Sequence, residues 1–363
     1  MIDSLGFATF LKSKFSFFAG VPDSLLKPIN NALEEILPKE QFLIASNEGQ
    51  AIAFASAYHL ATKQIACVYM QNSGLGNAIN PILSLADPEV YAIPMILFIG
   101  LRGGKDDEPQ HAKQGRVTRD ILNACEIENY ILDKELSTAK QQICNAIQKC
   151  KSEKKIIAFL IEKDTFNAYN LARKKNTYNI VREEAISLIQ DAYIDAKIIT
   201  STGYISRECY ELRKIKNQNH CNDFLVVGSM GYASSLAYVL SKYSSNKIVC
   251  LDGDGAFIMH LGSILNFKYS NFLHVVLNNE IHDSVGGQFT SAKNASFIKL
   301  AKSCGYDYCF SVSNIKQLKK KLEEIKKING LVFLEIKVKQ QTRTNLGRPK
   351  NILQLKEDFC KEF

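Results

Sequence analysis

Two polar turns, each directly after an apolar run, carry residue types that bind a hard cation. Gly253-Asp254-Gly255-Ala256 follows the first run, and Asn278-Asn279 ends the second. If both runs are strands of one parallel sheet, their carboxyl ends open on a common edge and Asp254 meets Asn279 there. A carboxylate and an amide oxygen suit magnesium, and amides beside glycines can receive a phosphate. Gly-Asp-Gly alone is typical of a tight turn, so the hypothesis depends on the paired asparagines.

A glutamate near the N-terminus is the second candidate for chemistry. Ser46-Asn47-Glu48-Gly49 leads into a stretch of small residues that predicts a closely packed helix. An acid in the first turn of a helix is common, because it interacts favourably with the helix dipole. From the residues alone, Glu48 is either such an acid or a buried carboxyl whose pKa is raised by desolvation.

Short apolar runs alternate with longer amphipathic ones, and this alternation must position both candidates. The 363 residues suit two domains of ordinary size. Strands are predicted at Ile65–Tyr69, Ile93–Ile99, Ile156–Ile161, Lys197–Thr200, Leu225–Val227, Lys247–Asp252, Leu273–Leu277 and Leu331–Ile336. Helices are predicted at Leu25–Ile36, Gln50–Thr62, Thr138–Lys151, Arg182–Ala192 and Ile315–Lys327. The pattern indicates an α/β fold of two doubly wound parallel sheets, joined by a polar linker at 167–178.

Composition argues against several classes of function. No basic, apolar leader begins the chain, and the apolar run Val90–Gly100 is too short to span a membrane. Ten cysteines form no CxxC pair, as expected of free thiols in a reducing compartment, so we expect a cytoplasmic protein. The net charge of +8 is modest, and the lysines of Lys316–Lys327 are typical of a solvated helix face. Neither a nucleic acid nor a membrane is an expected partner.

Further segments give the chain a family resemblance. Together with Glu48 and the turns at 253–256 and 278–279, these segments make the chain resemble the thiamine-diphosphate-dependent decarboxylases, and among them the phosphonopyruvate decarboxylases. The segments that carry the closer resemblance are Gly20–Ser24, Gln71–Asn77, Asp107–His111, Ser206–Glu208, His282–Gln288 and Asn345–Pro349. They cover nearly the whole chain in the family's order, although the loop at Arg102–Lys105 is shorter than is usual there.

The resemblance implies an architecture and a partner. Residues 1–172 would form a pyrimidine-binding domain and residues 178–363 a diphosphate- and magnesium-binding domain, with no middle domain between them. In the family, the first domain faces the second domain of a neighbouring subunit. A homo-oligomer, at least a dimer with its active site at the subunit interface, is therefore implied.

The resemblance also implies ligands for thiamine diphosphate and magnesium. Asp254, the Asn279 side chain and the Ile281 carbonyl would bind the metal. Met230 would support the bent cofactor, and the Gly228 carbonyl would accept a hydrogen bond from its aminopyrimidine. The other implied cofactor contacts are Thr202, Gly203, Ser229, Gly253, Gly255, Ala256, His282 and Ser284.

Catalytic and substrate-binding roles follow from the same resemblance. Glu48 would activate the cofactor through its pyrimidine ring, while Asp23 and His111 would relay a proton. The candidate substrate contacts are Ser24, Asn72, Lys105, Arg207, Arg343 and Arg348. Each of these cations is also explained as a surface charge, His111 as an ordinary loop histidine, and Asn72 as part of a turn.

The implied activity is that of a carboxy-lyase. Phosphonopyruvate would lose carbon dioxide through the cofactor's ylide and an enamine and give phosphonoacetaldehyde. Sulfopyruvate decarboxylase, another 2-oxo acid decarboxylase and a carboligase remain open alternatives. So do a non-catalytic thiamine-diphosphate-binding subunit, which would have no need of Glu48, and a plain nucleotide-binding α/β protein.

Overall fold

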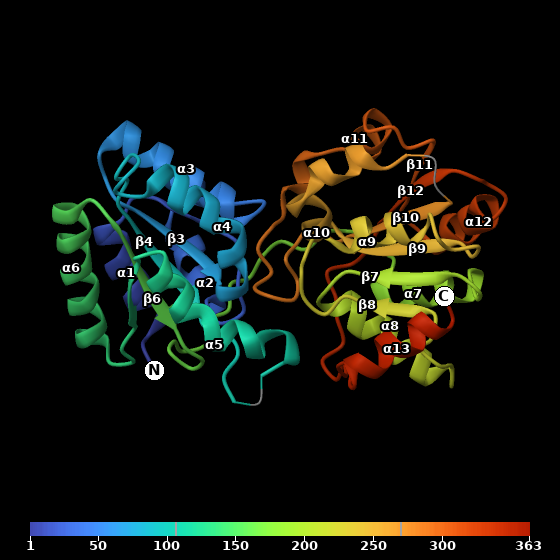
Figure 1. Cartoon of the computed structure of the whole chain (residues 1–363), viewed down its shortest axis with the longest axis horizontal. Coiled ribbons are helices and arrows are strands. Elements are labelled where there is room, and N and C mark those ends of the chain that lie inside the picture. The colour runs from blue at the N-terminus through green and yellow to red at the C-terminus, as the bar shows by residue number, and fades with distance from the viewer. Residues whose placement is uncertain (106, 269–270) are drawn as a thin grey trace. The chain divides into compact units, whose positions relative to one another are not determined.

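The computed structural model describes residues 1–105, 107–268 and 271–363. The chain forms two compact units. Met1–Arg173 and Val285–Gln288 make up the first unit, and Lys174–Ser284 and Phe289–Phe363 make up the second. Each unit contains one six-stranded parallel sheet between helices (Figure 1). The predicted α/β class with two doubly wound sheets is confirmed, and the described residues form no third unit. None of the described helices is both long and apolar enough to span a membrane.

The first sheet has the strand order β2-β1-β3-β4-β6-β5. Its strands are β1 (Phe18–Gly20), β2 (Phe42–Ile44), β3 (Ala66–Gln71), β4 (Met95–Gly100), β5 (Glu128–Ile131) and β6 (Ile156–Ile161). Its helices are α1 (Ser4–Lys14), α2 (Lys27–Ile36), α3 (Glu48–Thr62), α4 (Leu75–Pro81), α5 (Pro109–Ala124) and α6 (Leu136–Glu153). Every residue of β4 and β6 is buried, because helices cover both faces, and this explains their uninterrupted apolar sequences.

The second sheet has the order β11-β12-β10-β9-β7-β8. Its strands are β7 (Lys197–Thr200), β8 (Asp223–Leu225), β9 (Ile248–Gly253), β10 (Phe272–Asn278), β11 (Tyr308–Val312) and β12 (Leu331–Lys337). Its helices are α7 (Arg182–Ala192), α8 (Tyr204–Ile215), α9 (Ala233–Leu240), α10 (Asp254–Met259), α11 (Phe297–Ser303), α12 (Ile315–Ile325) and α13 (Ile352–Lys361). One apolar cluster packs α7, α8 and α12 on one face, and another packs α9, α10 and α11 on the opposite face (Figure 1).

Each sheet has a point where the chain reverses its direction of winding. In the first unit β2 and β3 lie on opposite sides of β1, and in the second unit β8 and β9 lie on opposite sides of β7. Ligands of such sheets bind outside the carboxyl ends of the strands at this point. The tips of β1 and β3, and those of β7 and β9, are therefore where a site is expected.

The predicted strands mostly agree with the structure, and the exceptions are short or lie at sheet edges. The apolar run Leu225–Val227 was predicted as a strand, but β8 is Asp223–Leu225, because these are the residues that pair with Ile198–Thr200 of β7. Four strands had no prediction: β1, β2, β5 and β11. Residues 167–178, the predicted linker, contain no helix or strand.

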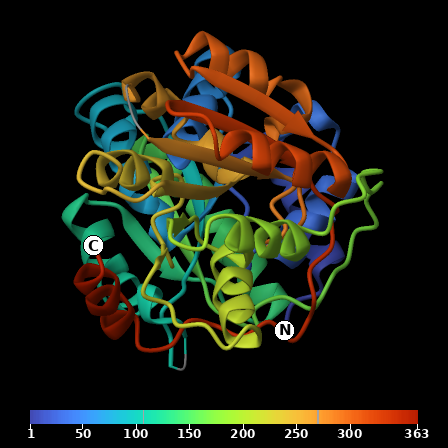
Figure 2. The ribbon, with the colours of Figure 1, turned by 90° about the vertical axis from the view of Figure 1, so that its right-hand side faces the viewer.

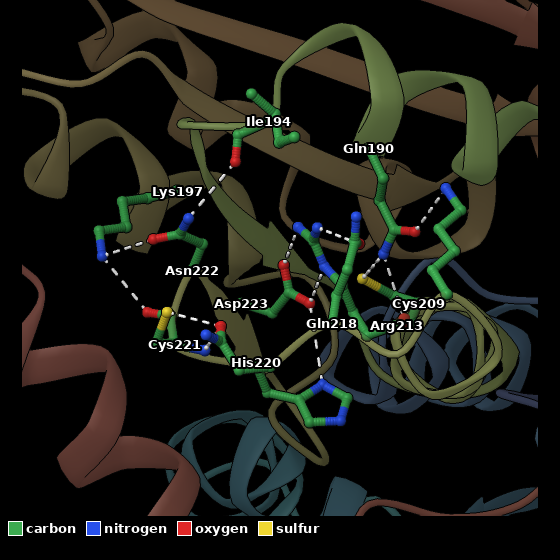
Figure 3. Close-up of polar contacts among 12 residues, drawn as sticks. Gln190, Ile194, Lys197, Cys209, Arg213, Gln218, His220, Cys221, Asn222 and Asp223 are labelled. Atoms are coloured by element: carbon green, nitrogen blue, oxygen red, sulfur yellow. Dashed lines mark hydrogen bonds and ion pairs between the residues drawn. The ribbon is translucent and has the colours of Figure 1, made fainter.

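A buried ion pair holds β8 at the amino edge of the second sheet. Arg213 Nε and Nη2 donate to the two carboxylate oxygens of Asp223, each at 2.9 Å, and Nη1 donates to Gln218 (Figure 3). Nearby, Lys197 Nζ donates to Asn222 Oδ1 at 2.9 Å. Both members of the Arg213–Asp223 pair are almost fully buried, at 3% and 1% exposure. Removing one member therefore leaves the other charge without compensation.

We expect Arg213→Met to lower the free energy of unfolding of the second unit by about 3–5 kcal/mol, because Asp223 is left buried and unpaired. Urea denaturation followed by circular dichroism measures the change. Lys214→Met is the matched control: Lys214 is its exposed neighbour in α8, with a surface ion pair to Glu211, so its effect stays within about 1 kcal/mol. Equal effects of both changes would contradict this view of the pair.

Candidate functional site

The two metal-type turns of the second unit meet at the carboxyl edge of the sheet. β9 and β10 are adjacent and parallel, with Leu277 opposite Gly253. The Asn279 backbone N–H lies close enough to the Asp254 carboxylate to lower its pKa. The convergence expected of Asp254 and Asn279 is therefore present.

The Asp254 carboxylate is well placed to receive a cation. It is 2% exposed, and the donors near it are neutral: the Thr290 hydroxyl donates a hydrogen bond to it, and the backbone N–H groups of Asn279 and Gly255 also lower its pKa. Burial raises the pKa of Asp254 to about 7, against the lowering effect of these donors. A buried carboxylate of this kind is stabilised by a positive counter-charge, and a carboxylate oxygen is a ligand type that suits magnesium.

The loop after β10 is held by many hydrogen bonds. Asn279 Oδ1 accepts from the Ile281 N–H at 3.1 Å, and Glu280 between them has a left-handed φ of 66°. The Asn279 carbonyl accepts from Asn176 Nδ2 at 3.1 Å and from Gln340 Nε2 at 3.0 Å. These contacts fix the direction of the chain at the residues predicted to hold the metal.

The Gly228–Met230 turn lies against the same glycine-rich segment. A Cβ atom at Gly255 would lie 3.3 Å from Met230 Cε and 3.0 Å from His282 Cε1, so these two side chains border that glycine. Ser229 has a left-handed φ of 49°. Burial lowers the pKa of His282 to about 4, so its ring is neutral at pH 7.

The tip of β7 is the third component of this edge. The Thr202 hydroxyl donates to the Val227 carbonyl at 2.8 Å. Gly203 has a positive φ of 88° and begins the turn into α8. A Cβ atom at Gly203 would lie 3.2 Å from the Ser284 hydroxyl, so the segments around 203 and 284 are in contact. We define these parts of the edge, at 202–203, 228–230, 253–256 and 279–284, as the cofactor edge.

A polar triad under the Asp254 turn was not anticipated from the sequence. His274 Nδ1 bonds the Tyr306 hydroxyl at 2.7 Å, and His274 Nε2 lies 3.4 Å from Asp252 Oδ2. Asp252 and His274 are fully buried on neighbouring strands. Both lie within sequences that are otherwise apolar, as expected of buried strands. A polar residue inside such a sequence was the only feature that could have indicated the triad.

Glu48, in the first unit, is a buried carboxyl at the start of α3. It is 5% exposed, and its Oε2 accepts from Asn77 Nδ2 at 2.8 Å. Its other oxygen packs directly against Gly74, where any side chain would overlap it. Burial raises the pKa of Glu48, and the Asn77 hydrogen bond opposes this change. The glutamate is therefore a buried acid and not a solvated first-turn residue.

Asp23 follows β1 and is fully buried. Its Oδ2 accepts from the backbone N–H groups of Leu25 and Leu26, at 2.8 and 3.1 Å. Its Oδ1 is buried and has no hydrogen-bond partner in the described part of the chain. Burial raises the pKa of Asp23, while the backbone N–H groups and Arg102 lower it. One oxygen thus supports the turn, and the other is buried without a partner among the described residues.

Asn72 and Ser24 contribute to the fold of this edge through Arg102. Asn72 Nδ2 donates to the Arg102 carbonyl at 2.9 Å and to the Thr118 hydroxyl at 3.0 Å. Arg102 Nη1 donates to the Ser24 hydroxyl at 2.8 Å, and its Nε donates to Asp107 at 2.8 Å. Sequence reasoning missed Arg102 as the centre of this group. Substrate contacts by Asn72 and Ser24 stay predictions.

His111 and Lys105 lie on either side of the undescribed residue 106. His111 is partly buried near the start of α5, and its ring lies in a group with the carboxylates of Asp107 and Glu108, with one ligand atom of each within 4.8 Å of the others. Lys105 is exposed. Neither geometry assigns a chemical role, so the proton-relay role of His111 and the anion-binding role of Lys105 stay predictions.

The remaining cations lie in or against the C-terminal strap, which we define as residues 339–351. The strap runs without helix or strand from the end of β12 to α13 (Figure 2, red). Arg207 donates to the carbonyls of Leu346 and Gly347, and Arg343 pairs with Glu183 at 3.0 Å. Arg348 is an exposed strap residue. Arg207 and Arg343 therefore hold the strap, and contacts of all three arginines to a substrate stay predictions.

Both units of the chain are similar to known protein families. Residues 201–336 match the family described as thiamine pyrophosphate enzyme, C-terminal TPP binding domain, and residues 6–123 match the N-terminal TPP binding domain. A phosphonopyruvate decarboxylase of Streptomyces viridochromogenes is 30% identical over 92% of this chain and 87% of its own length. The sulfopyruvate decarboxylase subunit beta of Methanocaldococcus jannaschii is 35% identical over 30% of this chain and 58% of its own length. The subunit alpha of the same organism is 37% identical over 32% of this chain and 68% of its own length. The chain therefore belongs to the thiamine pyrophosphate enzyme family.

Proposed function

We propose that this chain is a magnesium- and thiamine-diphosphate-dependent carboxy-lyase that converts phosphonopyruvate to phosphonoacetaldehyde and carbon dioxide. The observation that carries the proposal is that the Asn279 backbone lies beside the buried Asp254 carboxylate, at the tips of the adjacent parallel strands β9 and β10. It brings the two predicted metal ligands together where ligands of such sheets bind. The match to a phosphonopyruvate decarboxylase over 92% of this chain supports the choice of substrate.

The second unit would hold the diphosphate end of the cofactor. Asp254, the Asn279 side chain and the Ile281 carbonyl would bind magnesium. The glycines of the cofactor edge admit a close approach of the backbone to phosphate oxygens. Thr202 and Ser284 would contact the diphosphate as hydroxyl donors. Met230, beside Gly255, would support the bent cofactor.

The first unit would supply the proton chemistry. Thiamine diphosphate, when bound, supplies the carbon nucleophile and the electron sink for decarboxylation. Glu48 would hold a proton on the pyrimidine nitrogen, and its burial favours the protonated carboxyl that this needs. Asp23, with one buried oxygen unused by the protein in the described residues, would take part in protonating the product together with His111.

We also propose that the active enzyme is a homo-oligomer, at least a dimer. Glu48 and Asp254 belong to separate units, and a complete site needs both. Two relatives are named as the beta and alpha subunits of sulfopyruvate decarboxylase, whereas this chain matches both of the family's domains. Two copies would then supply two equivalent sites. The active site would lie at the interface between subunits.

Sulfopyruvate decarboxylation is the second candidate function, since those relatives also match. A phosphonate carries about one more negative charge than a sulfonate near neutral pH, because its second ionisation lies near pKa 6. A non-catalytic cofactor-binding subunit is less consistent with the structure. Such a protein would have no use for the buried Glu48 carboxyl and the Asn77 amide that holds it.

We expect Glu48→Gln to bind the cofactor with nearly unchanged affinity and to release carbon dioxide about 10²–10⁴-fold more slowly, because the amide cannot hold the proton. Calorimetry measures the binding, and a coupled carbon dioxide assay measures turnover. Glu89→Gln, at an exposed position of the same unit, is the matched control and should act as the unchanged enzyme. Undiminished turnover in Glu48→Gln would contradict the mechanism.

Asp254→Asn should raise the magnesium concentration needed for half-maximal cofactor binding by about 10–100-fold, because the charged ligand is lost. Titration of magnesium at a fixed thiamine diphosphate concentration measures this, and chelation followed by magnesium return tests reversibility. Asp195→Asn removes an exposed carboxylate of the same unit and serves as the control. Cofactor binding by Asp254→Asn with normal metal dependence would refute the assignment.

A substrate comparison tests the choice of 2-oxo acid. With phosphonopyruvate, sulfopyruvate and pyruvate assayed in parallel, we expect kcat/KM for phosphonopyruvate to exceed the others by at least about tenfold, as recognition of one additional charge allows. A coupled aldehyde assay provides the rates. A higher kcat/KM for sulfopyruvate would favour the second candidate and leave the cofactor chemistry in place.

A further inference from the structure

Arg182 is a buried arginine with three polar neighbours from three separate segments. It begins α7 and is 3% exposed. Its Nε and Nη2 donate to the two oxygens of Glu208, each at 2.8 Å. Its Nη1 donates to Asp283 Oδ2 at 3.0 Å, and Nη2 also donates to the Thr342 hydroxyl at 2.6 Å. One guanidinium therefore joins α8, the loop after β10 and the C-terminal strap.

The bonded segments are parts of the cofactor edge or directly adjacent to it. Asp283 lies between His282 and Ser284, and the Thr342 hydroxyl donates to its carboxylate at 2.6 Å. Tyr204 follows Gly203, and the guanidinium groups of Arg182 and Arg207 each lie 5.5 Å from the centre of its ring. Arg182 thus contacts Tyr204, which follows Gly203, and Asp283, which precedes Ser284.

These links differ from those that the sheet supplies. β7 and β10 are not adjacent, because β9 lies between them, so no ladder hydrogen bonds set the loop after β10 relative to the β7 tip. The planar guanidinium presents donors in a rigid fork that can bridge Glu208 and Asp283 at once, whereas a lysine ammonium is a compact point charge. The position of the loop is therefore sensitive to the shape of this side chain as well as to its charge.

We propose that Arg182 is a positioning residue for the cofactor edge. By holding Asp283 against α8 and the strap, it sets the spacing between Thr202-Gly203 and the loop Asn279–Ser284, and so the affinity for magnesium and thiamine diphosphate. This inference rests on the proposed function. Arg182 itself touches neither cofactor nor substrate in the proposal.

The same unit supplies a matched control. Arg213 makes an equally buried two-oxygen pair with Asp223, but at the amino edge of the sheet, away from the strand tips (Figure 3). Arg182→Lys and Arg213→Lys are therefore the same chemical change at opposite ends of one sheet. Thr342→Val is a milder variant, since it removes one hydroxyl and leaves the Arg182–Glu208 pair in place.

The test is calorimetric titration of thiamine diphosphate in saturating magnesium, with the melting temperature of each variant measured alongside. We expect Arg182→Lys to weaken cofactor binding by about 10–100-fold, as for other groups that orient metal ligands, and Thr342→Val to weaken it by ~3–10-fold. The kcat at saturating cofactor should stay within about twofold, since binding and not chemistry is affected. Arg213→Lys should lower the melting temperature and leave cofactor affinity unchanged.

The outcomes separate this inference from the function on which it rests. If the unchanged protein binds no thiamine diphosphate, the proposed function fails. If it binds, but Arg182→Lys and Thr342→Val bind equally well, the positioning role alone is refuted. Equal weakening by Arg213→Lys would also refute it, because the effect would then follow from general destabilisation. Should Arg182→Lys not fold, Thr342→Val decides the question by itself.

Discussion

A carboxylate buried at the tip of a parallel strand is the constraint that organises the second unit. Such a group is unfavourable unless hydrogen bonds and an opposite charge compensate for its loss of solvent. Here neutral donors surround Asp254, and the proposed magnesium would supply the balancing charge. The loop after β10 is correspondingly well bonded, through the linker at Asn176, the strap at Gln340 and the guanidinium of Arg182. These contacts hold the loop in place beside the Asp254 carboxylate.

The two units use the same physical effect for different purposes. Burial raises the pKa of both Glu48 and Asp254. In the first unit an amide and a glycine surround the acid, so it is suited to keep a proton. In the second unit the acid lies beside the Thr290 hydroxyl and backbone N–H groups at a strand tip, and in the proposed function it would exchange its proton for a metal ion. Pairs of acids in contrasting environments are characteristic of catalytic sites.

Periodicity predicted the long buried strands because residues such as those of β4 and β6 must be apolar on both faces. It did not predict β1 and β2, which have three residues each and too little pattern. The meeting of Asp254 and Asn279 was predictable, since parallel strands share an edge. The use of Asn72, Arg207 and Arg343 within the fold was not, because their partners lie far away in the sequence.

Because Glu48 packs against Gly74, the substitutions that each of these two positions tolerates depend on the residue at the other. A side chain at position 74 would occupy the space of a flexible carboxyl group and not that of the backbone, so the protein would fold with its acid displaced. Selection for folding alone would therefore leave position 74 free to vary, and only selection for turnover would keep it as glycine. In a descendant that had lost the glutamate, alanine at that position would become harmless, and such a pair of changes would mark the loss of catalysis in its genome.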